Sequence, residues 1–297
     1  DRKKGGLFMV PGNAYGTTKG GMRFLLRDII SNKTLFQRSD KPYVVMMGTN
    51  VIFNMDLNTI IEAHEKSGAQ MTVVYCKATH NVDDETKLDI NENGRLTGVS
   101  AGVAYGDNAS MDCCIVNRET LLEIIDHYQA ADYLDLLEAL QGDFGNIDVC
   151  SYEYKGEVVG VFSEKSLYRR SMDLLDQTVA DQLFDPERPI LTKAHDVPPS
   201  RYATGSHACN SIISAGCIIK GTVRNSILSR GVVIEEGASV TNSIINQSCI
   251  IKSGARVENA ILDKNNVVPA NTELRGTPEN ILVLGKAPLT SDTTIAR

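Results

Sequence analysis

The chain has 297 residues, of which 42% are hydrophobic and 23% charged, so it is long enough for two domains with ordinary cores. Its formal net charge of −7 argues against a protein that binds the phosphate backbone of nucleic acids. No apolar run reaches the roughly 18 residues that a membrane helix needs. No signal-peptide pattern stands at the start. We therefore expect neither nucleic acid nor membrane as a partner.

The seven cysteines are an odd number without paired spacing, which is not the pattern of a disulfide framework or a metal site. Cys113 and Cys114 are adjacent and would face opposite sides of a strand. Cys217 and Cys249 stand where small hydrophobic residues are expected. We expect reduced thiols, no metal site and a cytoplasmic location.

The chain begins with residues that predict the first part of an α/β sheet domain. Residues 5–10 form an apolar run typical of a strand, and residues 11–20 are rich in glycine and predict a loop. Residues 21–31 carry apolar positions at helical spacing. The chain lacks an initiator Met and enters the first strand almost at once, so we expect a domain whose start is missing.

A β-α-β unit follows. Strands are predicted at 43–47 and 71–76, with a helix at 57–67 between them and Asp56 as its N-cap. Ligands of open α/β sheets bind at the carboxyl ends of strands. We therefore expect a site at 48–50, directly after the first of these strands.

The rest of this domain contains a hairpin turn at 89–95, where Asn93-Gly94 favours a type I′ turn. Further elements are predicted as helices at 118–128 and about 131–141, and as strands near 147–154 and 157–162.

A Pro-rich stretch at 186–199 predicts an extended, semi-rigid spacer between domains. Three basic residues line this stretch: Arg188, Lys193 and Arg201. Two interpretations of them stay open, namely solvated surface charge or part of a phosphate-effector site at the domain junction.

Residues 210–274 carry a repeat in which an Ile, Leu or Val recurs every four to six residues, with a longer period of about 17 residues. Asn or Gly stands three positions before most of them. Both residue types tolerate positive φ, so each marks a corner, and each aliphatic side chain points inward. Ser248 and a shortened step around Gly221 break the rule. The spacing resembles that of a left-handed parallel β-helix, whose stacked coils bury one aliphatic column.

Chance repetition and a flat sandwich are the alternatives. Both are disfavoured because Asn-Ser-Ile-Ile at Asn210 recurs in closely similar form at Asn225, Asn242 and Asn259. Acyltransferases built on such a β-helix are a rival for the function of this half. They need a His in the coils as base, but the nearest His, His207, precedes the first coil.

The run V-V-M-M-G-T-N-V-I-F-N-M-D-L, followed by H-E-K-S-G-A-Q-M-T-V-V, resembles the ADP-glucose pyrophosphorylase family (glucose-1-phosphate adenylyltransferases). That family reads Gly-Asp-His-Ile-Tyr-x-x-Asp, then a His in the next helix, then Gly-Ala-x-x-Thr. The matching residues are Ile52, Asp56, His64, Gly68, Ala69, Thr72 and the hinge Pro198-Pro199-Ser200-Arg201-Tyr202.

The resemblance extends from about residue 40 onward. It implies an α/β nucleotidyltransferase with a Rossmann-like mixed sheet, N-terminally incomplete here, followed by a left-handed parallel β-helix. The expected parts are a nucleotidyltransferase-like domain at 1–180, a linker at 181–206, and a β-helix domain with a C-terminal tail at 207–297.

The departures from the family carry the functional expectation. Nucleotidyl transfer uses Mg²⁺ held by carboxylates. One of these belongs to the family's Gly-Asp-His, whose Asp and His correspond to Asn50 and Val51 here. An amide keeps the shape of a carboxylate but not its charge. We expect Asp56 to cap a helix rather than bind metal, and His64 to be structural rather than catalytic.

Two further losses follow from the same resemblance. The Glu and Lys that hold the sugar phosphate correspond to Ala101 and Gly102. The second metal motif, Trp-x-Asp-Val-Gly-Thr, falls on 158–163, so Gly160 replaces the Asp, Phe162 replaces the Gly and Ser163 ends the motif. Asp112 stands where a strand of the family has Gly.

These losses are typical of the GlgD-type branch of the family. The resemblance implies a glycogen-biosynthesis protein, a non-catalytic or weakly active regulatory subunit. It would pair with a catalytic homologue, in a hetero-tetramer or homo-oligomer, that makes ADP-glucose and diphosphate from ATP and glucose-1-phosphate. No cofactor is expected on this chain, and Mg²⁺ is expected in the partner. The alternatives are an independently active sugar-1-phosphate nucleotidyltransferase that uses Asp112, and a β-helix scaffold without a nucleotide role.

Overall fold

The computed structural model describes residues 9–10, 26–128, 135–140, 146–192 and 196–287. The chain forms two compact units, Asp1–Phe162 and Ser163–Arg297. The predicted loop at 11–20 lies outside the described residues, as do most of the predicted strand at 5–10 and half of the predicted helix at 21–31. Within the described part, no helix is long and apolar enough to cross a membrane.

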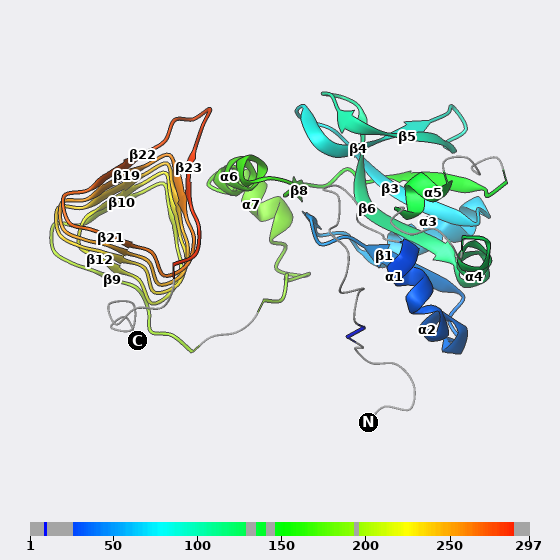
Figure 1. Ribbon diagram of the computed structural model, residues 1–297, viewed down its shortest axis with the longest axis horizontal. Helices are drawn as coiled ribbons and strands as arrows, with labels where there is room; N and C mark the ends of the chain where they lie inside the picture. The colour runs from blue at the N-terminus through cyan, green and yellow to red at the C-terminus, as the bar shows by residue number, and fades with distance from the viewer. Residues whose placement is uncertain (1–8, 11–25, 129–134, 141–145, 193–195, 288–297) are drawn as a thin grey trace. The chain divides into compact units, whose positions relative to one another are not determined.

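The first unit is built on a mixed sheet, which in the described residues has six strands in the order β5-β4-β6-β3-β7, with β1 beside β6 (Figure 1). The strands of this sheet are β1 (Tyr43–Met47), β3 (Met71–Lys77), β4 (Val82–Ile90), β5 (Leu96–Val103), β6 (Asn108–Asn117) and β7 (Val149–Glu153). A separate two-stranded ribbon consists of β2 (Val51–Phe53) and β8 (Val158–Gly160). The helices of this unit are α1 (Leu26–Ser31), α2 (Lys33–Arg38), α3 (Leu57–Ser67), α4 (Arg118–His127) and α5 (Leu136–Leu140).

Strand β6 lies at the centre of this sheet. Along one edge it pairs antiparallel with β1 over Cys113–Asn117 and with β4 at Ala109, and along the other edge it pairs with β3. Cys114 packs in the cluster that contains residues of α4, and Cys113 packs in the cluster that contains Ile60 of α3. The two cysteines therefore face opposite sides of the strand, as predicted, with helices over both faces.

Strands β1 and β3 run parallel, as the predicted β-α-β unit implies, but do not pair, because β6 lies between them. One local prediction differs from the structure. The turn between β4 and β5 is not type I′, which needs positive φ at both central residues. Only Gly94 has it, at 73°. The side chain of Asn91 instead closes the turn by accepting hydrogen bonds from the backbone N–H groups of Asn93 and Arg95, each at 3.0 Å.

The second unit is a parallel β-solenoid with three sheets, each of five strands in the described residues. The first sheet contains β9 (Arg201–Tyr202), β12 (Ile218–Ile219), β15 (Val233–Ile234), β18 (Ile250–Ile251) and β21 (Val267–Val268). The second contains β10 (His207–Cys209), β13 (Thr222–Arg224), β16 (Ser239–Thr241), β19 (Arg256–Glu258) and β22 (Glu273–Arg275). The third contains β11 (Ile212–Ile213), β14 (Ile227–Leu228), β17 (Ile244–Ile245), β20 (Ala260–Leu262) and β23 (Leu282–Leu284).

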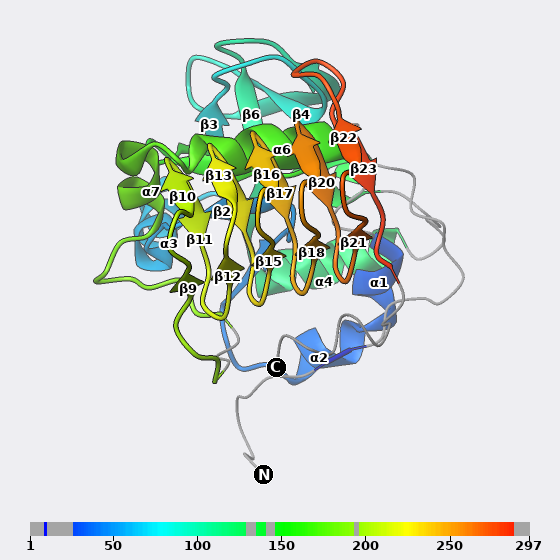
Figure 2. The same cartoon turned by 90° about the vertical axis from the view of Figure 1, so that its left-hand side faces the viewer.

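Two helices also belong to the second unit: α6 (Glu164–Asp173) and α7 (Gln177–Leu183). Helix α6 runs along the stacking direction of the coils, beside the sheet that contains β23 (Figures 1 and 2). The hydroxyl of Tyr168 donates to the carbonyl of Asn242 at 2.7 Å. The domain boundary predicted at 180 thus differs from the observed division. The predicted linker also differs, since α7 reaches Leu183 and Arg201 pairs with Ile218 of the solenoid.

The repeat pattern is confirmed for both of its kinds of residue, the inward aliphatic residues and the corner residues. The twelve aliphatic residues of the repeat either belong to one buried cluster or, for Ile213 and Leu274, pack against it while partly buried. They are Ile213, Ile219, Val223, Leu228, Ile234, Val240, Ile245, Ile251, Val257, Leu262, Val268 and Leu274. All ten predicted corners have positive φ: Asn210, Gly216, Asn225, Gly231, Gly237, Asn242, Gly254, Asn259, Asn265 and Asn271. Ser248, which breaks the residue rule, has the same conformation, with φ of 60°. The predicted fold, a mixed α/β sheet followed by a left-handed parallel β-helix, is confirmed.

The recurrent Asn-Ser pairs form two ladders of side chains between coils. Asn210 donates to the side-chain oxygen of Asn225, and Asn225 donates to that of Asn242. The hydroxyl of Ser226 accepts from the backbone N–H of Ser243 at 3.1 Å, and the hydroxyl of Ser243 accepts from the N–H of Ala260 at the same distance. Each serine thus satisfies a buried N–H group of the next coil, which the aliphatic column alone would leave unpaired.

The shortened step of the first coil also has a physical reason. A Cβ on Gly221 would lie 2.2 Å from the carbonyl oxygen of Ala238 and 2.8 Å from that of Glu235. The neighbouring coil therefore approaches the backbone at Gly221 so closely that only glycine fits.

We predict that Ser243→Ala lowers the free energy of unfolding of the solenoid by about 1–3 kcal/mol, because the buried N–H of Ala260 loses its acceptor. Denaturant unfolding followed by far-UV circular dichroism measures this change. The matched control is Ser239→Ala, since the side chain of Ser239 makes no hydrogen bond within the described residues. Equal effects of the two substitutions would contradict the serine ladder as a source of stability.

Candidate functional site

The ribbon of β2 and β8 brings together two positions that are far apart in the sequence. Val51 lies directly opposite Gly160, and the backbone N–H of Val161 donates to the carbonyl of Asn50 at 2.7 Å. The family resemblance implies a metal carboxylate at the positions of Asn50 and of Gly160. The structure therefore brings the two positions to the same end of the ribbon, with Gly160 on β8 and Asn50 directly before β2.

Asp112 lies beside the residues that lead into this ribbon. The N–H of Gly48, just after β1, donates to the carbonyl of Asp112 at 2.7 Å. A Cβ on Gly48 would lie 2.8 Å from the Cβ of Asp112, so this contact requires glycine. Asp112 is only 5% exposed and has φ of 47° at an irregularity in the pairing of β6 with β3. Such a backbone suits glycine, the family's residue here, and aspartate is among the few others that adopt it.

The thiols next to Asp112 are not available as nucleophiles. Burial and, after it, the neighbouring Asp112 carboxylate raise the pKa of Cys113 to about 12. Burial also raises the pKa of Cys114 well above its ordinary value. Because the thiolate is the reactive form, both residues are structural.

The positions of the sugar-phosphate clamp lie on the β4–β5 hairpin. Ala101 pairs with Thr86, and Gly102 has φ of 84°. Glu85 precedes Thr86, and its Oε1 lies 3.0 Å from where a Cβ of Gly160 would stand. The hairpin therefore borders the ribbon, but Ala101 and Gly102 offer no charged group for a phosphate.

Ser163 has a capping role. Its hydroxyl accepts from the backbone N–H of Ser166 at 3.2 Å, and its own N–H donates to the hydroxyl of Ser166 at 2.8 Å. The two residues form a capping box at the start of α6. Ser163 thus belongs to the second unit, whereas the other degenerate positions lie in the first.

Asp56 and His64 have the structural roles predicted for them. Asp56 is the N-cap of α3, and its Oδ1 accepts from the N–H of Asn58 at 2.9 Å. His64 is 2% exposed, with Nδ1 at 2.8 Å from the hydroxyl of Thr72 and Nε2 at 3.0 Å from Oδ1 of Asn117. The amide oxygen accepts only, so Nε2 carries the proton and Nδ1 accepts from Thr72.

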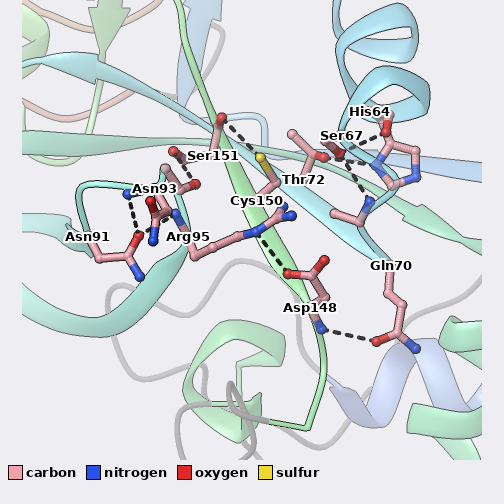
Figure 3. A network of polar contacts seen from close by, with 12 residues as sticks. His64, Ser67, Gln70, Thr72, Asn91, Asn93, Arg95, Asp148, Cys150 and Ser151 are labelled. Atoms are coloured by element: carbon pink, nitrogen blue, oxygen red, sulfur yellow. Dashed lines mark hydrogen bonds and ion pairs between the residues drawn. The ribbon is translucent and has the colours of Figure 1, made fainter.

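The same region contains further polar contacts, drawn in Figure 3. Arg95 forms an ion pair with Asp148 at 3.1 Å, and the backbone N–H of Asp148 donates to the side-chain oxygen of Gln70 at 3.0 Å. The hydroxyl of Ser151 donates to the carbonyl of Gly94 at 2.9 Å. These contacts tie the β4–β5 turn to β7 and to the start of β3, so they fix the sheet rather than form a site.

The predicted basic residues differ in their availability. Arg188 forms an ion pair with Asp185 at 3.2 Å. The pKa of Asp185 is lowered mainly because its carboxylate accepts a hydrogen bond from the backbone N–H of Glu187. A hydrogen bond from the Arg188 side chain is the second cause. Arg201 is exposed on β9 at the end of its sheet. Lys193 lies outside the described residues.

The side chains at the ribbon do not fit Mg²⁺, which takes oxygen ligands and usually one or two carboxylates. Asn50 offers an amide, and Val51 and Gly160 offer no oxygen from a side chain. Within the described ranges, no group of three His, Cys, Asp or Glu side chains is placed to hold a metal ion. We therefore assign no metal-dependent step to these residues.

Comparisons with known proteins agree with the fold and the family resemblance. Residues 197–280 match the family model described as GlmU-like, C-terminal hexapeptide. The chain is 30% identical over 292 residues to the glycogen biosynthesis protein GlgD of Bacillus subtilis (strain 168). That alignment covers 96% of this chain and 74% of the relative. It is also 30% identical over 302 residues to the glucose-1-phosphate adenylyltransferase of Halalkalibacterium halodurans, covering 96% of this chain and 77% of the relative. The chain belongs to the glucose-1-phosphate adenylyltransferase family.

Another similar protein of this family is the glycogen biosynthesis protein GlgD of Geobacillus stearothermophilus, with 30% identity over 205 residues. That alignment covers 69% of this chain and 51% of the relative, so the matched part spans about half the length of that protein. The family resemblance inferred from the matching motifs is thus confirmed.

Two residues near Gly160 were not predicted as part of the site: Glu85 and Phe162. Both have atoms within about 3 Å of the position that a Cβ of Gly160 would take. Glu85 left no sequence signal, because its proximity depends on how β4 lies against β8. Phe162 did leave one, since it replaces a glycine of the family motif.

We predict that iodoacetamide at about pH 8 modifies Cys209 in the folded protein but leaves four buried cysteines unmodified. These are Cys113, Cys114, Cys217 and Cys249. Burial removes access and raises the pKa of all four thiols, to about 12 for Cys113 and about 11 for Cys249. Peptide mass spectrometry after timed labelling measures the outcome, with full labelling in denaturant as control. Labelling of Cys113 as fast as Cys209 would contradict the described packing.

Proposed function

We propose that this chain is a glycogen-biosynthesis protein, a non-catalytic or weakly active regulatory subunit of glucose-1-phosphate adenylyltransferase. In this proposal it pairs with a catalytic homologue that converts ATP and glucose-1-phosphate into ADP-glucose and diphosphate. Support comes from family membership, and from the similarity over most of the chain to proteins named for glycogen biosynthesis.

The single observation that carries the proposal is the pairing of Val51 with Gly160. This pairing brings Asn50, which precedes Val51, near Gly160. The family motifs have a metal carboxylate at each of these two positions, and neither position has one here. Phosphoryl chemistry on ATP depends on a cation that neutralises phosphate oxygens. A chain with an amide and a glycine at these positions would bind such a cation weakly.

The proposed partner is a catalytic subunit of the same family, in a hetero-tetramer or homo-oligomer in the cytoplasm. It would supply both the Mg²⁺ ligands and the sugar-phosphate clamp that Ala101 and Gly102 lack. Arg201 is the basic residue best placed to bind an effector phosphate, because it is exposed, whereas Arg188 already pairs with Asp185.

A second candidate function is independent sugar-1-phosphate nucleotidyl transfer that uses Asp112. The observation in its favour is the close approach of Asp112 to Gly48, at the carboxyl end of β1 where ligands bind in such sheets. A single carboxylate at this position is a weak metal site compared with the family's two. We therefore rank this function second.

We predict that the full-length protein makes no ADP-glucose alone and raises the turnover of its catalytic homologue severalfold when the two are mixed. The measurement is ADP-glucose formed from ATP, glucose-1-phosphate and Mg²⁺ by the chain alone, the homologue alone and the mixture. Gel filtration of the mixture reports whether the two chains assemble. A mixture that behaves as the sum of its parts would contradict the subunit role.

Asp112→Asn distinguishes the two candidates. Asparagine tolerates the positive φ at this position and has nearly the same size, so the fold should persist. The regulatory role predicts that this substitution leaves the activity of the mixture unchanged. Activity of the chain alone that falls by about two orders of magnitude in this variant would establish the second candidate instead.

A further inference from the structure

The ring of Phe162 occupies the space beside Gly160 where a side chain would begin. A Cβ on Gly160 would lie 2.5 Å from Cε2 and 3.3 Å from Cζ of Phe162. Phe162 lies two residues beyond the end of β8, and its ring turns back toward Gly160. Real Cβ contacts do not reach 2.5 Å, so any side chain at position 160 must displace the ring.

The backbone at this point is held by pairing with the neighbouring strand. Gly160 pairs with Val51, and the N–H of Val161 donates to the carbonyl of Asn50 at 2.7 Å. Val159, the preceding residue of β8, is only 4% exposed. The strand is thus held on both sides of Gly160, and relief of a clash falls to the ring of Phe162.

We propose that Phe162 closes the metal position at Gly160, so that a carboxylate restored there remains excluded from cation binding until Phe162 is also replaced. The loss of the site is then steric as well as chemical. This inference deepens the proposed function and rests on it for the choice of a divalent cation as the probe.

Glu85 adds an electrostatic contribution. Its Oε1 lies 3.0 Å from the Cβ position of residue 160, so an aspartate there would bring a second carboxylate close to that of Glu85. Two neighbouring carboxylates disfavour joint ionisation in the absence of a cation. A bound divalent cation relieves this repulsion, so cation binding should become visible once the ring no longer fills the space.

The steric part is tested by a double-mutant cycle that needs no ligand. We predict that Gly160→Ala lowers the melting temperature by about 5 °C in the wild-type chain and by less than about 1 °C in a Phe162→Ala background. The matched control is Phe53→Ala on the neighbouring strand β2, in which Gly160→Ala should retain its full effect. Differential scanning calorimetry measures all six chains. The same loss in the wild-type and Phe162→Ala backgrounds would overturn the proposal.

The cation part is tested with Mn²⁺, whose free form is quantified by electron paramagnetic resonance. The Mn²⁺ affinity is compared between a double variant, Asn50→Asp with Gly160→Asp, and a triple variant that adds Phe162→Ala. The triple variant should bind Mn²⁺ at least tenfold more tightly than the double variant. Equal affinities, whether both bind or neither does, would overturn the proposal. Circular dichroism of each variant verifies that it is folded.

Both measurements use the chain by itself. Their failure would leave the proposed pairing with a catalytic homologue untouched, because only the synthesis assay and gel filtration report on that pairing. Conversely, a chain that fails to stimulate its homologue would still show the cycle between Gly160 and Phe162 if the ring closes the position.

Discussion

Strand β6 changes its pairing partner along one edge, and this change positions the candidate site of the first unit. From Cys113 onward the edge pairs with β1, and at Ala109 it pairs with β4. Asp112 lies between the two partners with left-handed backbone, and its carbonyl accepts from Gly48 where β1 ends. The chain then leaves the sheet and enters β2. The change of partner thus coincides with the point where residues 48–51 leave the sheet edge and meet β8.

The two units show how differently sequence patterns translate into structure. In the solenoid each coil repeats the same local demands, a corner residue that tolerates positive φ and an aliphatic that points inward. Local composition therefore predicted ten corners and the twelve recurring aliphatic residues of the core. Ser248 shows the limit of the residue rule, because it has the positive φ of a corner although it is neither Asn nor Gly.

Motifs in the sequence named several residues of the candidate site but not their arrangement in space. Motif spacing identified Asn50 and Gly160, and capping rules identified Asp56, since these depend on short stretches of sequence. The pairing of Val51 with Gly160, the approach of Glu85 to that pair and the insertion of β6 between β1 and β3 depend on contacts between distant segments. No local pattern encodes such contacts. The capping box that ties Ser163 to α6 was missed, because Ser166 stands where the usual sequence signal has Glu or Gln.

The contact between Phe162 and Gly160 bears on how a site of this kind stays inactive. Loss of a carboxylate alone is reversed by one substitution, because the space for the side chain persists. Once an aromatic ring fills that space, the reverse substitution clashes with the ring and places a carboxylate beside Glu85. Regaining the site then requires at least two changes, of which the first brings no cation binding by itself. In this chain the proposed steric closure would thus separate the fold from the family's chemistry more firmly than the missing charges alone.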